Sequence, residues 1–99
     1  MRVVHVMASA ESGGGSSYLR ELLPQLALLG VESELVTSRN GPLGPALADA
    51  GFKVRYLDLM GSRFSVRTVA ELRSILMDRQ PSLVHLHGTR AGLYGALAC

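Results

Sequence analysis

Residues 2–30 read RVVHVMASAESGGGSSYLRELLPQLALLG, and this stretch decides the fold. Its first part is a valine-rich apolar run, which predicts a β-strand over 2–8 that is buried on both faces. A glycine-rich loop follows, through Ser16, and leucines at helical spacing then fill residues 17–29. Strand, glycine-rich loop and helix in this order are typical of a βα unit in a parallel sheet.

Several features of the first helix can be predicted in detail. Ser16 or Ser17 can cap it, because a side-chain oxygen accepts a hydrogen bond from an amide of the first turn. Pro24 removes one backbone hydrogen bond, so we expect a kink or an early break there. Gly30 suits the position after the helix end. The residues expected at helical spacing are Tyr18, Leu19, Leu22, Leu23, Leu26 and Leu29.

The rest of the chain alternates in the same way. We predict strands at 31–37, 53–57 and 82–87, helices at 43–50 and 66–79, and a further helix beginning around Thr89 to Arg90. Four βα units imply an α/β, Rossmann-like parallel sheet of strand order 3-2-1-4, truncated after the fourth strand. Ligands of such sheets bind beyond the carboxyl ends of the strands, so loops 9–16 and 87–90 should flank one crevice.

Composition excludes several classes of protein. The 99 residues are 47% hydrophobic, which suits one small domain with a core. The net charge is +2 and the few aromatic residues are scattered, so the basic stripe of a nucleic-acid-binding protein is absent. Cys99 is the single cysteine, and no apolar run reaches the roughly 18 residues of a membrane span. We expect a cytoplasmic protein without a nucleic-acid partner.

The glycine-rich loop can hold an anion. Consecutive glycines let the backbone approach a ligand and adopt positive φ, and amides at a helix start attract phosphate. The alternative is a surface loop that needs glycine only to turn. A dinucleotide fingerprint fails, because Tyr18 stands where its third glycine is required. Arg39, after the second predicted strand, leaves an NADP-binding protein open.

Three histidines lie in two of the predicted strands. We predict that His87 enters the crevice as a functional residue, since it ends the fourth strand. His85 points to the same side, and we interpret it as a hydrogen-bonded core residue and His5 as structural. Two histidines at i, i+2 can ligate a metal, but no third ligand is evident, so no metal site is predicted.

The order of these motifs resembles the N-terminal part of a GT-B fold glycosyltransferase of the GT4 type. The resemblance covers the whole chain. It rests on MRVVHV at 1–6, Gly13-Gly14 before a leucine-rich helix, GVESELVT at 30–37 and PSLVHLHGTRAGL at 81–93. The segment LMGSRFS at 59–65 is similar to members that build cell-surface polysaccharides.

The resemblance implies that residues 1–99 form a partial, acceptor-side domain, inactive alone because the C-terminal donor-binding domain is absent. It implies transfer with retained configuration, from a UDP- or GDP-linked sugar to a glycan or lipid-linked acceptor, without a cofactor or metal. His87 would touch the donor sugar near the reacting carbon. The residues expected to bind the donor diphosphate or substrate are Gly13, Gly14, Gly15, Ser16, Gly88, Thr89 and Arg90.

Two other functions stay open: an NADP-type Rossmann oxidoreductase, and a non-catalytic binding module of flavodoxin-like shape. The predicted fourth strand would be an edge in this chain, so we expect the isolated chain to dimerise or aggregate. A lipid-linked acceptor leaves peripheral contact with the inner face of the membrane open.

Overall fold

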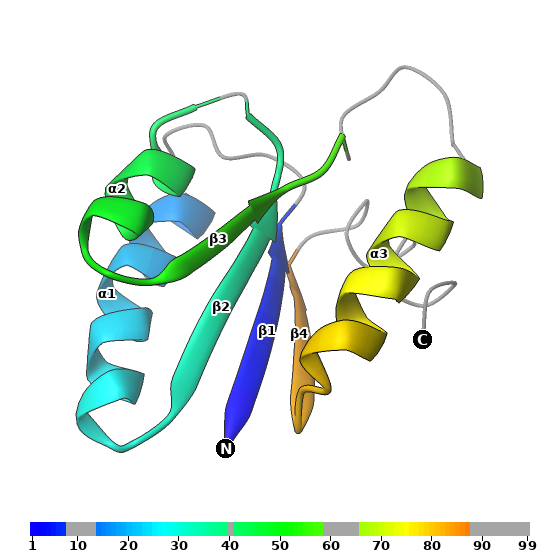
Figure 1. The fold of residues 1–99 in the computed structure, drawn as a ribbon. Coiled ribbons are helices and arrows are strands. Elements are labelled where there is room, and N and C mark those ends of the chain that lie inside the picture. Colours follow the sequence, from blue (N-terminus) through cyan, green and yellow to red (C-terminus); the bar gives the residue numbers. More distant parts are fainter. Residues whose placement is uncertain (8–13, 40, 59–65, 88–99) are drawn as a thin grey trace.

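The computed structural model describes residues 1–7, 14–39, 41–58 and 66–87. Its centre is a four-stranded parallel sheet of order β3-β2-β1-β4, as predicted (Figure 1). Each strand begins and ends within about one residue of its predicted bounds. The strands are β1 (Arg2–Met7), β2 (Glu32–Thr37), β3 (Lys53–Tyr56) and β4 (Leu83–His87).

Three helices cover the sheet. The helices α1 (Gly14–Leu28) and α2 (Leu43–Asp49) lie on one face, and α3 (Val66–Arg79) lies on the other (Figure 1). Alternate residues of β1 and β2 point to opposite faces, so both strands contribute to both cores. The α3-side core is built on Val4, Val6, Val36, Leu57, Leu72 and Leu76. The α1-side core is built on Met7, Leu19, Leu23, Leu35, Leu43 and Leu47.

The start of α1 corrects the sequence analysis. The helix begins at Gly14, so Ser16 and Ser17 lie inside its first turn and neither is the cap. Gly14 and Gly15 are helical, whereas the positive-φ glycines in the described part of the chain are Gly30 and Gly51. The first turn of α1 therefore presents the amides of Gly14, Gly15 and Ser16, which have no acceptor within the helix.

The course of α1 also differs from the prediction. The helix continues through Pro24 to Leu28, so the early break, one of the two outcomes expected there, does not occur. Fewer residues of this segment are buried than the helical spacing of its apolar residues predicts. Leu19 and Leu23 are fully buried, whereas Tyr18 is 51% and Leu29 is 78% exposed. Leu29 lies beyond the helix end, and Tyr18 lies beside the carboxyl end of β4.

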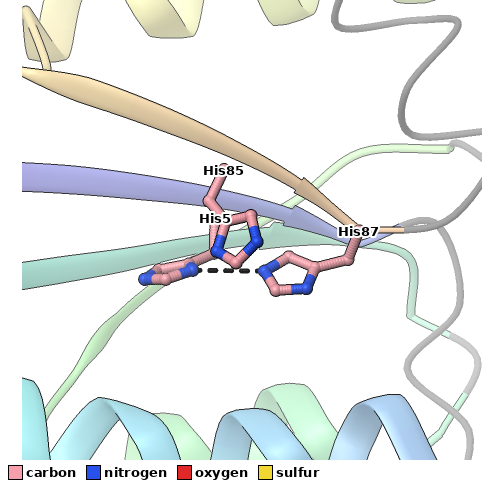
Figure 2. A group of neighbouring side chains, drawn as sticks. All are labelled: His5, His85 and His87. Atoms are coloured by element: carbon pink, nitrogen blue, oxygen red, sulfur yellow. Dashed lines mark hydrogen bonds between the residues drawn. The ribbon is translucent and has the colours of Figure 1, made fainter.

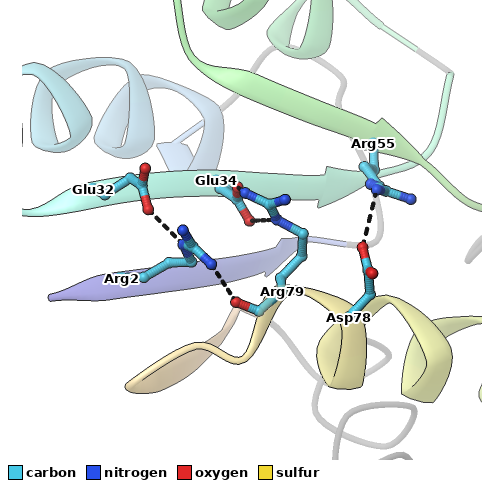
Figure 3. Close-up of polar contacts among 6 residues, drawn as sticks. All are labelled: Arg2, Glu32, Glu34, Arg55, Asp78 and Arg79. Atoms are coloured by element: carbon cyan, nitrogen blue, oxygen red, sulfur yellow. Dashed lines mark hydrogen bonds and ion pairs between the residues drawn. The ribbon is translucent and has the colours of Figure 1, made fainter.

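An ion-pair network ties α3 to the amino-terminal half of the sheet (Figure 3). The Arg79 guanidinium pairs with Glu34 on β2, and Arg2 on β1 pairs with Glu32 and donates to the Arg79 carbonyl. Arg55 and Asp78 form a more exposed pair at 3.6 Å. Among the described residues, no helix has the length and apolar character needed to cross a membrane.

Candidate functional site

The candidate site lies where β1 and β4 run side by side on the face covered by α1. His5 is paired in register with His85, and Met7 with His87. Residues at i and i+2 of a strand share a face, so the three histidines form one group (Figure 2). The parallel register therefore assembles a histidine cluster from two segments far apart in the sequence.

The rings of the cluster are in close contact. His5 Nδ1 lies 3.2 Å from His87 Nε2, which is hydrogen-bond distance (Figure 2). The ring centroids of His85 and His87 are 3.8 Å apart, and those of His5 and His85 are 5.4 Å apart. His5 is buried, and the other two are half-buried.

The surroundings keep two of these imidazoles uncharged. Burial, followed by the nearby His87 and His85 rings, lowers the pKa of His5 to about 4. Burial and the His85 ring lower the pKa of His87 to about 4 as well. Both side chains are therefore neutral at pH 7, and each offers one hydrogen-bond donor and one acceptor.

His5 is the residue that the sequence analysis undervalued. The sequence suggests a structural role for it and places strands one and four side by side, but it does not give their register. Part of the signal was available: a histidine on strand one and two on strand four, at positions that can share one face in one register of the strands. The structure adds the register, which sets His5 opposite His85.

The cluster also supplies the third metal ligand that was not evident in the sequence. One ring nitrogen from each of His5, His85 and His87 lies within 4.8 Å of the others. Two ligands of a tetrahedral zinc ion are about 3.3 Å apart, given Zn–N bonds of about 2.0 Å. The 3.2 Å contact between His5 and His87 is thus compatible with a shared metal as well as with a hydrogen bond.

The N-terminal part of α1 approaches the same place. The Tyr18 ring lies 6.3 Å from the His87 ring, centroid to centroid. Gly14, Gly15 and Ser16 form the first turn of α1, one turn before Tyr18. The structure therefore brings His87 close to the helix that the glycine motif begins. The other predicted binding residues lie outside the described part of the chain: Gly13, Gly88, Thr89 and Arg90.

Arg39, the residue that left NADP open, has its own partner. Its guanidinium lies 4.4 Å from the centroid of the Tyr56 ring, in a cation–π contact. Ser38 is buried and donates to the carbonyl of Leu57, 3.3 Å away. The residues that follow β2 thus contact Tyr56, the last residue of β3, and Leu57, the residue after it.

Comparisons with known proteins agree with this architecture. Residues 13–99 match the family described as "Glycosyl transferase 4-like domain". The crystal structure of MurG from Acinetobacter baumannii superposes with a TM-score of 0.75 at 17% sequence identity, which is a likeness of fold. That alignment covers 98% of this chain and 31% of the MurG chain. No curated protein matches the chain significantly.

Proposed function

The chain belongs to the glycosyl transferase 4-like domain family, and from that premise we propose that it is the acceptor-side N-terminal part of a retaining glycosyltransferase. The donor is a UDP- or GDP-linked sugar, and the acceptor is a glycan or lipid-linked glycan of a cell-surface polysaccharide. In this proposal a C-terminal donor-binding domain completes the active site, and this chain alone does not transfer sugar.

The observation that carries the proposal is the proximity of His87 to the N-terminal turns of α1. A helix start offers amides that have no acceptor within the helix, and its dipole favours negative charge. Those amides, contributed around Gly13, Gly14, Gly15 and Ser16, would stabilise charge that develops on the departing diphosphate.

In the proposed reaction His87 orients the donor sugar and does not exchange protons. Its lowered pKa keeps it neutral at pH 7, so it acts through a hydrogen bond at the end of β4. Gly88, Thr89 and Arg90 would extend the binding surface beyond it. The reaction needs no metal, because helix amides and basic side chains carry the diphosphate charge.

The family match weighs against the NADP-type oxidoreductase and the flavodoxin-like binding module. The contact of Arg39 with Tyr56 also gives that arginine a role within the fold. A direct test separates the enzyme classes. The protein encoded by the complete gene is incubated with UDP- and GDP-sugars and an acceptor extract, and nucleoside diphosphate release is followed; NADPH is titrated in parallel.

We expect one nucleotide sugar to be consumed, and NADPH fluorescence to stay unchanged. NMR of the product then gives the configuration of the new bond, which should match that of the donor. Saturable NADPH binding without turnover of any nucleotide sugar would contradict the proposal.

A further inference from the structure

The contact between His5 and His87 couples the protonation of the two imidazole rings. His5 lies in the middle of β1 and is 1% exposed, while His87 is the last residue of β4. The Nδ1 atom of His5 and the Nε2 atom of His87 are 3.2 Å apart, so the two rings meet edge to edge across the strand pair (Figure 2). The state of one imidazole therefore constrains the other.

Two proton arrangements satisfy this contact when both rings are neutral. In the first, Nδ1–H of His5 donates to Nε2 of His87, and His87 then carries its own proton on Nδ1. In the second, Nε2–H of His87 donates to Nδ1 of His5, and His5 then carries its proton on Nε2. Each neutral imidazole has one N–H and one lone pair, so one choice fixes both tautomers.

The surroundings of His5 select between them. Its Nε2 atom is buried and has no hydrogen-bond partner among the residues that the structure describes. The second arrangement would place a proton there, and buried N–H groups without an acceptor are rare in folded proteins. We infer that His5 is a positioning residue, which donates from Nδ1 and holds His87 as the Nδ1–H tautomer.

The Nε2 atom of His5, which has no partner among the described residues, also weighs against a metal at this cluster. A metal bound to Nδ1 of His5 would force the proton of that ring onto Nε2, which lacks an acceptor in the described part of the chain. Metal-bound histidines almost always donate their other N–H to a carboxylate, carbonyl or water. We therefore interpret the shared contact as a hydrogen bond.

The tautomer determines what His87 can recognise. Because Nε2 of His87 accepts from His5, its Nδ1–H is the group left for a ligand. A ligand that binds there must therefore offer a hydrogen-bond acceptor. On the proposed function, on which this step rests, that group is an oxygen of the donor sugar. A histidine free in water favours the Nε2–H tautomer, so the pairing with His5 reverses the ordinary preference.

Nitrogen-15 NMR of the imidazole rings tests the inference without any activity assay. The chain is labelled with ring-¹⁵N histidine, and long-range ¹H–¹⁵N correlations at pH 7.5 report which nitrogen of each ring is protonated. We expect Nδ1–H for both His5 and His87. In His5→Phe, the Nε2–H form of His87 should become the major one; His85→Gln is the matched control and should leave His87 unchanged.

The inference is overturned if His87 is the Nε2–H tautomer in the unmodified chain. That measurement needs no variant, so a failure of His5→Phe to fold does not weaken it. An unchanged His87 tautomer in folded His5→Phe also overturns it, as does stoichiometric binding of Zn²⁺ that removes the Nδ1–H signal of His5. Failure of the proposed glycosyl transfer would leave the tautomer result standing, so the two failures are distinguishable.

Discussion

The guanidinium of Arg79, the last residue of α3, forms a two-pronged ion pair with the buried carboxylate of Glu34 on β2. The Nε to Oε2 distance is 2.9 Å. Only 7% of the Glu34 side chain and 18% of the Arg79 side chain are exposed. The hydrogen bonds that Arg79 donates to Glu34 raise the pKa of the Arg79 guanidinium. This pair fixes the end of α3 against the sheet.

Replacing Arg79 should therefore destabilise the fold. Arg79→Met leaves the Glu34 carboxylate buried without its partner, and an unpaired buried charge is costly. The matched control is Arg67→Met, which breaks the pair between Arg67 and Glu71 on the surface of α3, where the arginine side chain is 89% exposed. Urea unfolding should show a clear fall in midpoint for Arg79→Met and almost none for Arg67→Met. Equal midpoints would contradict the role of the buried pair.

Mild acid should also destabilise the fold through the histidine cluster. The pKa of His5 and of His87 is about 4 in the folded chain, against 6.5 for an unperturbed histidine. The folded state thus binds fewer protons than the unfolded state between these values, so stability is complete above about pH 6.5 and falls as the pH drops toward 4. Among the described residues, the titratable groups in ring contact with them are His85 and Tyr18.

The measurement is the urea midpoint at pH 7.5 and at pH 5.5, where most carboxylates remain ionised. We expect a lower midpoint at pH 5.5 for the unmodified chain and a smaller difference for His5→Phe, which removes one of the two titrating groups. A midpoint that rises on acidification would contradict the assignment of neutral histidines.

Gly30 holds the turn between α1 and β2. Its φ is +81°, in the left-handed region, and apart from Gly30 and its two chain neighbours no heavy atom of the described residues lies within 4 Å of the position where a Cβ would stand. Gly30→Ala should therefore cost about 1 kcal/mol of backbone strain without a steric clash. Gly30→Asn should cost less, because asparagine tolerates this conformation. Thermal unfolding of both variants compares their stabilities. An alanine variant more stable than the asparagine variant would contradict the role of the positive φ at Gly30.

The sheet was predictable because its signals are local and repeated. A valine-rich first run, later short apolar runs and Gly30 after α1 indicate the strand and helix order, and the βα alternation then limits the topology. The start of α1 was not predictable, because glycine and serine are compatible with both a loop and a first helical turn. The role of His5 was missed because it depends on register between β1 and β4, which no local pattern specifies.

The outer edge of β4 should promote self-association of the isolated chain. Among the described strands β4 pairs with β1 alone, and Leu83 at its start is 52% exposed. An uncovered edge offers unpaired backbone groups to a second copy. We expect light scattering to detect dimers or larger species at high concentration. Leu83→Lys should reduce the amount of these species, because a charge on an edge strand opposes pairing with a second strand. If the unmodified chain is monomeric at high concentration, self-association through the β4 edge is contradicted.

The central claim is that His87 serves sugar transfer at the carboxyl end of β4. The most direct test compares the complete protein with its His87→Ala variant in a transfer assay, once the donor is known, with the exposed Arg67→Gln as control. Removal of a hydrogen bond that orients the reacting sugar should lower kcat/KM by about 100-fold or more, while Arg67→Gln stays near the unmodified rate. Unchanged transfer by a folded His87→Ala protein would contradict the account.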